Sequence, residues 1–91
     1  MFEFEWDPRK AALNLRKHGV SFDEAATIFG DHLALTFADP DHSELEERLL
    51  TFGVSSENRL LVVSHTPRDP RIRILSARRV TRAERKIYEE G

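Results

Sequence analysis

Arginine is concentrated in the last third of this 91-residue chain, and the types and spacing of residues point to chemistry there. Residues 1–58 carry five Lys and Arg against twelve Asp and Glu, whereas residues 59–91 carry nine against four. Eight of those nine cations are arginine. Because a guanidinium binds phosphate through two parallel N–H donors, the pattern predicts a local anion site. A nucleic-acid backbone is the ligand that this site favours.

Several arginines fall at or near the expected ends of strands and turns. We interpret them as a cluster that binds phosphate and stabilises a transition state, and they are Arg48, Arg59, Arg68, Arg78 and Arg79. For any single arginine, a solvated charged surface is an equally good interpretation. The collective excess of arginine favours the functional interpretation.

Strand periodicity divides the C-terminal arginines between two faces. Arg71 and Arg73 share one face of a predicted strand, and Ile72 and Ile74 share the other. The isoleucines should meet helices, so the arginine face should lie on the open side of a sheet. Arg78 has the parity of the isoleucine face, which places it at the end of the strand or beyond a bulge.

Three residues are candidates for proton transfer. His65, at a strand end beside Thr66, is the best general acid or base among the four histidines. Glu84 and Tyr88 are four residues apart and share one face of a predicted helix, where either can contact Arg78. Tyr88 can also stack on a base or assist proton transfer. The alternative is a structural Arg–Glu pair beside a half-buried tyrosine.

No metal or cofactor is expected. The chain has no cysteine, which excludes a thiolate site, and no two histidines have the spacing of a helical metal motif. His42 stands in an acidic loop, where a metal site is the weaker interpretation. The acidic first residues do not resemble a signal peptide, and no apolar run approaches the roughly 18–20 residues that span a bilayer. We therefore expect a cytoplasmic protein without membrane contact.

The predicted elements follow the order β-α-α-β-β-β-β-α. Asp7-Pro8 starts a helix that Gly19 ends, Ser21 starts a second, and Thr81 with Glu84 caps a last one. Strands are predicted over residues 2–6, 33–38, 48–54, 59–66 and 71–75. Short turns between strands indicate an antiparallel meander. The predicted fold is one small α+β domain over residues 1–91, with an antiparallel four- to five-stranded sheet and helices on one face.

Four segments together resemble the BrnT family of bacterial toxins over nearly the whole chain. They are Phe4–Lys10 with Asn14, Lys17–Phe22, Glu46–Arg48 with Gly53, and Arg73–Arg78 with Glu84 and Tyr88. The resemblance implies a RelE-like fold and a ribonuclease toxin of a type II toxin–antitoxin pair that inhibits translation. It also implies a BrnA-type antitoxin partner, a hetero-oligomer with that partner, and contact with operator DNA only through the antitoxin.

The resemblance also implies site residues. Lys10 and His18 match basic positions of the first helix and its end, and the other matches are Arg48, Arg68, Arg78, Glu84 and Tyr88. One departure is His65, where the resemblance implies a tyrosine. We expect Arg48, His65, Arg68, Arg78, Glu84 and Tyr88 to be catalytic, and the substrate to contact Lys10, His18, Arg71, Arg73 and Arg79.

The expected reaction is metal-independent cleavage of RNA. The 2′-OH of RNA attacks the adjacent phosphate, and an arginine cluster stabilises the anionic transition state. His65, Glu84 or Tyr88 would move protons, and their division of roles stays open. Two alternatives remain: a non-catalytic module that binds nucleic acid, and a partner-binding domain whose arginine face docks an acidic protein.

Overall fold

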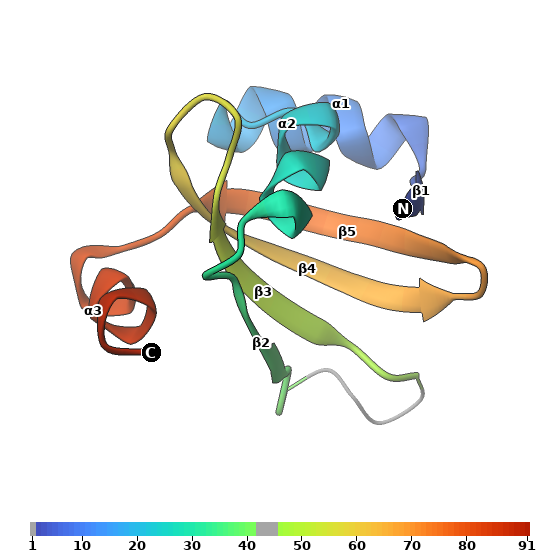
Figure 1. Ribbon diagram of the computed structural model, residues 1–91. Helices are drawn as coiled ribbons and strands as arrows, with labels where there is room; N and C mark the ends of the chain where they lie inside the picture. The colour runs from blue at the N-terminus through green and yellow to red at the C-terminus, as the bar shows by residue number, and fades with distance from the viewer. Residues whose placement is uncertain (1, 42–45) are drawn as a thin grey trace.

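Within the part of the chain that the structure describes, five strands form one sheet in the order β1-β5-β4-β3-β2, and three helices accompany it (Figure 1). The computed structural model describes residues 2–41 and 46–91. In chain order its elements are β1 (Glu3–Glu5), α1 (Pro8–His18), α2 (Phe22–Thr27), the 3₁₀ turn η1 (Ile28–Gly30), β2 (Leu35–Ala38), β3 (Leu49–Val54), β4 (Leu60–Arg68), β5 (Arg71–Arg79) and α3 (Arg82–Glu90). The α+β class is confirmed, and part of the acidic loop that contains His42 lies outside the described residues.

The sheet is mixed, which corrects the prediction of a purely antiparallel one. Strands β2 to β5 form the expected antiparallel meander, but β1 pairs in parallel with the first half of β5, with Phe4 opposite Ile72. Short turns between consecutive strands predict antiparallel neighbours. The pairing of β1 joins the two ends of the chain, and no local pattern reveals its direction.

Local sequence chemistry sets the helix ends where it was predicted to do so. The Asp7 carboxylate accepts a hydrogen bond from the Arg9 N–H at 2.8 Å at the start of α1. Gly19 ends this helix with φ 69°, a conformation that glycine adopts without steric cost. Thr81 and Glu84 form a complete capping box at the start of α3. These caps set both ends of α1 and the start of α3.

A bulge in β5 changes which side of the sheet its residues face. Ser76 lies opposite Ser64, but the neighbouring His65 lies opposite Ile74, so Leu75 is left unpaired between them. As a result Ile74 and Ala77 both lie in the core, although they are three residues apart. Arg78 therefore faces the other side of the sheet, beyond a bulge, as its parity required.

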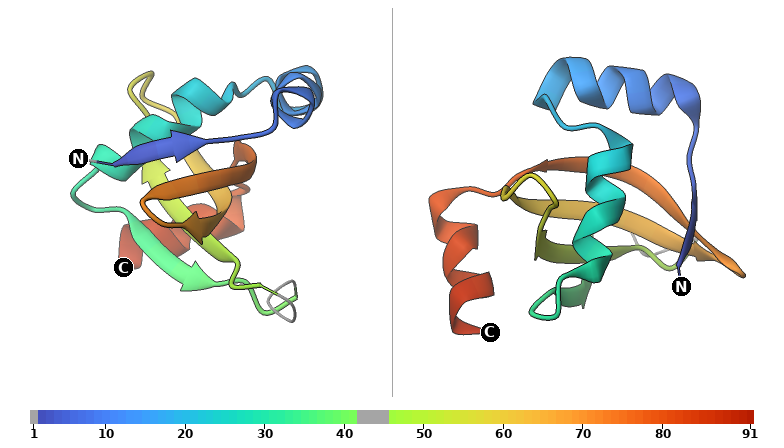
Figure 2. Two further views of the ribbon diagram at one scale, coloured as in Figure 1. Left: turned by 90° about the vertical axis from the view of Figure 1, so that its right-hand side faces the viewer. Right: turned by 45° about the horizontal axis from the view of Figure 1, so that its top comes forward.

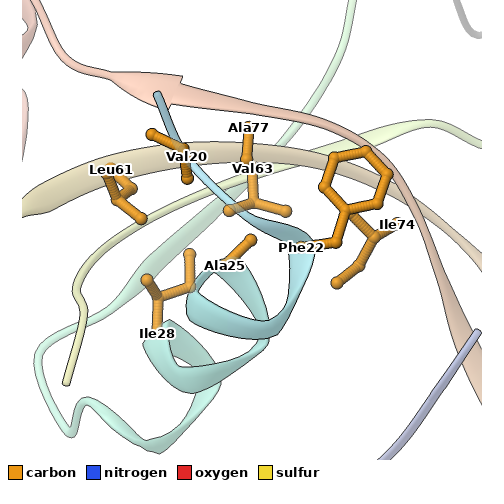
Figure 3. Packing of buried hydrophobic residues seen from close by; sticks show 8 residues of the cluster. All are labelled: Val20, Phe22, Ala25, Ile28, Leu61, Val63, Ile74 and Ala77. Carbon is orange, nitrogen blue, oxygen red and sulfur yellow. The ribbon is translucent and has the colours of Figure 1, made fainter. Parts of the chain in front are cut away.

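The hydrophobic core lies between the sheet and the chain that runs from the end of α1 through η1 (Figure 3). We call this side of the sheet the core face, and its residues include Leu61, Val63, Ile74 and Ala77. Opposite them pack Val20, Phe22, Ala25 and Ile28, all at most 2% exposed. Gly53 of β3 allows this close approach, because a Cβ at this position would lie 3.1 Å from atoms of Ile28 and would require Ile28 to shift.

The opposite side, which we call the open face, carries Leu50, Phe52, Val62, Ser64, Ser76 and Arg78. Helices α1 and α2 lie on one side of the molecule, and α3 lies apart from them (Figure 2). Helix α3 instead contacts residues of open-face parity, since Glu84 binds Arg78 and Gly91 lies against Leu35. It leaves the part of the open face around Ser64 and Ser76 accessible.

Candidate functional site

A hollow of about 360 Å³ opens on the open face, where β3, β4 and β5 lie side by side. Ser64 and Ser76 face each other across neighbouring strands in its wall. Lys10 of α1 lines one part of it, and Arg48, just before β3, lines another together with Asp39. The hollow thus combines two cations from distant parts of the chain, two hydroxyls and one carboxylate, a set that can bind a phosphodiester.

Three other open-face arginines, Arg68, Arg73 and Arg78, are held by carboxylates. Arg73 contacts Glu5 at 2.7 Å, and Arg68 contacts Glu46 at 3.1 Å. Glu46 also lies 3.4 Å from Arg48, and the hydrogen bond from Arg68 lowers the pKa of the Glu46 carboxyl. An incoming phosphate must therefore compete with these carboxylates. The carboxylates therefore offset part of the positive charge that the arginines bring to the open face.

Arg78 and Glu84 form the best-defined of these pairs. The guanidinium donates to both carboxylate oxygens, at 2.8 and 2.9 Å, and Glu84 also accepts from the Thr81 N–H at 2.9 Å. The pair lowers the pKa of Glu84 to about 2 and raises that of Arg78. Glu84 is thus ionised at neutral pH. It holds Arg78 on the open face, two residues along β5 from Ser76.

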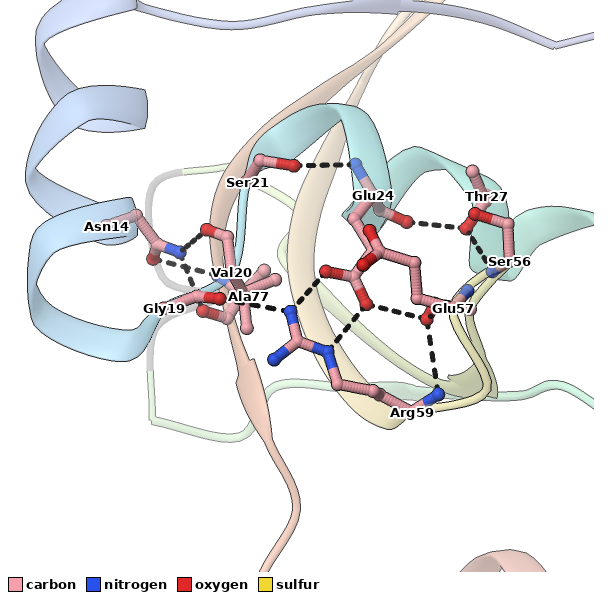
Figure 4. A network of polar contacts seen from close by, with 11 residues as sticks. Asn14, Gly19, Val20, Ser21, Glu24, Thr27, Ser56, Glu57, Arg59 and Ala77 are labelled. Atoms are coloured by element: carbon pink, nitrogen blue, oxygen red, sulfur yellow. Dashed lines mark hydrogen bonds and ion pairs between the residues drawn. The ribbon is translucent and has the colours of Figure 1, made fainter.

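Asn14 docks α1 against the edge of β5 that β1 leaves unpaired (Figure 4). Its amide donates to the Val20 carbonyl at 2.9 Å and to the Ala77 carbonyl at 2.8 Å, and its oxygen accepts from the Ala77 N–H at 3.0 Å. The side chain therefore replaces a neighbouring strand. Lys10 and His18 stand four residues before and after Asn14, so all three share one face of α1.

A buried ion pair fixes the C-terminal end of α1 (Figure 4). Glu24, 5% exposed, accepts from Arg59 and from the Ser55 hydroxyl, the latter at 2.6 Å. Arg59 also donates to the Gly19 carbonyl at 3.0 Å. Its hydrogen bond lowers the pKa of Glu24 against the effect of burial. Arg59, which the sequence grouped with the phosphate-binding cluster, is here the partner of a buried carboxylate.

His65 lies on the core face, away from the hollow. It is 5% exposed, and its ring packs edge-on against Phe29 with the ring centroids 5.0 Å apart. Its Nε2 lies 2.7 Å from the Thr51 hydroxyl. Burial lowers its pKa to about 4. His65 is therefore a buried imidazole, neutral at neutral pH, and it lies away from the open-face residues. The strand pattern gave its position but not its burial.

Tyr88 and Arg79 also lie apart from the hollow. The Tyr88 hydroxyl donates to Asp31 at 2.6 Å, and this hydrogen bond raises its pKa to about 12. Tyr88 thus pairs with the loop before β2 and not with Arg78. Arg79 pairs with Leu61 across the strands and has the alternation of the core face. Its positive charge helps to lower the pKa of Glu24. The half-buried Tyr88 and the Arg78–Glu84 pair correspond to the structural alternative weighed from the sequence.

The structure adds lining residues that sequence reasoning did not assign. Ser64, Ser76 and Asp39 line the hollow, and the bulge at Leu75 brings Ser76 and Arg78 to the same face as Arg71 and Arg73. The only sequence signal for them was the parity of Arg78. Of the predicted substrate contacts, Arg71 is exposed at the far end of β5, opposite Arg68 and Glu3.

Comparison with known proteins decides the family. Residues 6–84 match the model of the family described as ribonuclease toxin, BrnT, of type II toxin-antitoxin system. The chain belongs to the BrnT family. The fold agrees with the crystal structure of the Brucella abortus ribonuclease toxin BrnT, with a TM-score of 0.65 and 19% identity over 90% of this chain and 100% of that one. No curated protein matches the chain.

BrnT membership confirms the resemblance and gives the general function. The BrnT family comprises ribonuclease toxins of type II systems, which implies an RNA target and a protein antitoxin. The matched region includes Lys10, Arg48 and Arg78 but ends before Tyr88. The family match therefore covers every residue that lines the hollow.

Two further features concern only the described residues of this BrnT-family chain. None of its described helices is long and apolar enough to span a membrane. Among residues 2–41 and 46–91, no three His, Cys, Asp or Glu side chains gather into a group that could hold a metal ion. His42, considered from the sequence as a weak metal candidate, lies outside the described residues.

Proposed function

We propose that this BrnT-family chain is an endoribonuclease that cleaves RNA at the open-face hollow without a metal ion. The observation that carries this proposal is the convergence of Lys10 and Arg48 on one hollow, over the paired hydroxyls of Ser64 and Ser76. Lys10 and Arg48 are 38 positions apart in the sequence. A site assembled from such distant cations fits a ligand with concentrated negative charge.

The protein need not supply a nucleophile, because the RNA carries its own in the 2′-OH group. The 2′-oxygen attacks the adjacent phosphorus, the bond to the 5′-oxygen breaks, and the products are a 2′,3′-cyclic phosphate and a 5′-hydroxyl. Negative charge develops on the phosphorane oxygens, where Lys10 and Arg48 would stabilise it. Electrostatic stabilisation of this kind is usually the largest single contribution to catalysis.

Proton transfer in this proposal uses groups at the hollow. Among the described residues that line it, Asp39 is the one carboxylate, and we assign to it the acceptance of the 2′ proton. The departing 5′-oxygen takes its proton from a water molecule, which gives the 5′-hydroxyl. Arg78, held by Glu84, would add positive charge on the same face. His65 has no role in this scheme because it is buried on the core face. Tyr88 has none because its hydroxyl is committed to Asp31.

The partner in this proposal is a BrnA-type antitoxin, and it silences the toxin by covering the open face. Arg68 and Arg73 lie on that face, so a covering segment with Asp or Glu would match their charge. We propose contact with operator DNA only through the antitoxin. Because the target is cellular RNA, we place the action of the protein in the cytoplasm.

The decisive experiment is incubation of the purified protein with RNA in EDTA. Cleavage should persist, and Arg48→Ala should lower it roughly 10²–10³-fold, as expected when a preorganised charge is removed from a developing anion. Arg82→Ala, which removes the same charge from an exposed position of α3, is the matched control and should cleave normally. Circular dichroism melts should show that both variants fold.

Three results would contradict the proposal. Complete inhibition by EDTA would mean that a metal ion takes part. Normal cleavage by a folded Arg48→Ala variant would place the chemistry outside the hollow. RNA binding without any cleaved product would favour the non-catalytic nucleic-acid-binding module.

A further inference from the structure

A second concavity, which we call the α1 groove, lies beside the hollow. It has a volume of about 450 Å³, and the residues that line it are Lys10, Leu13, Asn14, Arg16, Lys17, His18, Leu75 and Ser76. Lys10, Leu75 and Ser76 line both the groove and the hollow. The two spaces therefore share a wall, and one extended ligand can occupy both.

The charges of the groove select a polyanion. None of the described residues that line it is acidic, whereas Lys10, Arg16 and Lys17 are cationic. This differs from the hollow, where Asp39 is present, and from Arg68 and Arg73, which contact carboxylates. Lys10 and Lys17 are separated by about 10 Å along the helix axis, so the positive charge extends along the groove.

The groove also offers apolar surface that is not used by the fold. Leu13 is 58% exposed although it lies on α1 beside the sheet edge, and the bulge residue Leu75 is half-buried opposite it. Apolar side chains next to cations suit a nucleotide, which presents a flat base face and a charged phosphate. A duplex keeps its base faces stacked inside and would not present them to Leu13.

We propose that the α1 groove binds the nucleotides that flank the cleavage point, so that the substrate is a single RNA strand that crosses the β5 bulge. This inference rests on the proposed function, because the hollow is the point from which flanking nucleotides are counted. Lys10 and Ser76 contact the junction. Lys17 contacts a flanking phosphate, and Leu13 contacts a base.

The test compares two pairs of variants on α1 and α3. Leu13→Ala is matched by Leu15→Ala, since Leu15 is 52% exposed on the same helix but does not line the groove. Lys17→Ala is matched by Lys86→Ala, on an exposed position of α3. The ligand for binding is a mixed-sequence single-stranded oligonucleotide with 2′-O-methyl groups, which cannot be cleaved. Its affinity is measured by fluorescence anisotropy at several salt concentrations.

Leu13→Ala and Lys17→Ala should each weaken binding of this oligonucleotide about three- to tenfold, and the matched controls should not. Lys17→Ala should also reduce the slope of log affinity against log salt by about 0.7, the value for one phosphate contact with a single strand. In cleavage assays both variants should raise KM for long RNA and leave kcat unchanged. A dinucleotide, too short to reach the groove, should be cleaved equally by all variants.

Equal binding by all four variants would overturn the proposal. So would an unchanged RNA affinity with a lost affinity for the antitoxin, because the groove would then be a protein-docking surface. Preference for duplex over single-stranded 2′-O-methyl RNA would also overturn it. If Leu13→Ala and Lys17→Ala weaken binding but Arg48→Ala still cleaves, binding of single-stranded RNA by the groove stands and the placement of the chemistry in the hollow fails.

Discussion

On the core face, buried polar side chains bind other side chains of the protein, whereas on the open face cationic side chains line a hollow. Glu24 is bound by Arg59 and Ser55, and His65 by Thr51. Lys10 and Arg48 instead line one hollow together with Ser64 and Ser76. The same strands build both faces, so charge alone does not distinguish a structural arginine from a functional one. What distinguishes them is the face to which the register assigns each residue.

The largest expected loss of stability comes from removing a large side chain from the core face. Phe22→Ala should lower the free energy of unfolding by about 3–5 kcal/mol, because Phe22 is 2% exposed and its ring packs edge-on against Trp6. Phe37→Ala is the control on the open-face side, where Phe37 is 44% exposed, and should cost about 1 kcal/mol or less. Urea denaturation measures both. Equal losses would mean that the two faces do not differ in packing.

Next in size is the link between the faces. Asn14→Ala should lower the free energy of unfolding by about 2–3 kcal/mol, because the Val20 carbonyl and both backbone groups of Ala77 lose their partner. RNA cleavage should fall too, since Asn14 docks the helix that carries Lys10. Asn14→Asp keeps the acceptor for the Ala77 N–H but sets a buried carboxylate oxygen against the Val20 and Ala77 carbonyls, so it should lose at least as much stability. Full cleavage by a destabilised Asn14→Ala would show that α1 need not be docked for activity.

A pH-dependent effect of about 2–3 kcal/mol is expected from His65. Its pKa is about 4 in the folded protein, against 6.5 as the ordinary value. Between these values the unfolded chain binds more protons, so the free energy of unfolding should fall as the pH falls from 6.5 to 4. Denaturation at several pH values should show this slope in the wild type and not in His65→Gln. Cleavage by His65→Gln at neutral pH should persist, and its loss would return His65 to the site.

The smallest expected change in stability comes from the Arg78–Glu84 ion pair on the open face. Glu84→Gln should cost about 1 kcal/mol at pH 7, because the Arg78–Glu84 pair is partly exposed. The pKa of Glu84 is lowered to about 2, so its contribution is present above its ordinary pKa and is lost as the pH falls toward 2. Stability curves of the wild type and Glu84→Gln should therefore converge in acid. A difference independent of pH would mean that the ion pair is not its cause.

Much of the fold could be predicted from local sequence. Asp7, Gly19 and the Thr81–Glu84 capping box fixed helix ends through contacts within a few residues. The meander β2 to β5 followed from short turns, although β5 runs to Arg79, beyond the predicted end at residue 75. The parallel pairing of β1 with β5 was missed, because it joins residues such as Phe4 and Ile72 that are far apart in the chain.

By itself the sequence determined the family, the uneven distribution of arginine and the parity that forced Arg78 past a bulge. Only the tertiary structure decided which titratable groups are buried, which arginines meet carboxylates, and which cations share a hollow. Burial sets the pKa of His65, and it depends on Phe29 and Thr51, more than ten residues away in the chain. Lys10 and Arg48 meet because Asn14 docks α1 on β5 and the sheet register carries Arg48 to the same face. Such contacts between distant residues depend on the packing of the whole domain, which no local pattern contains.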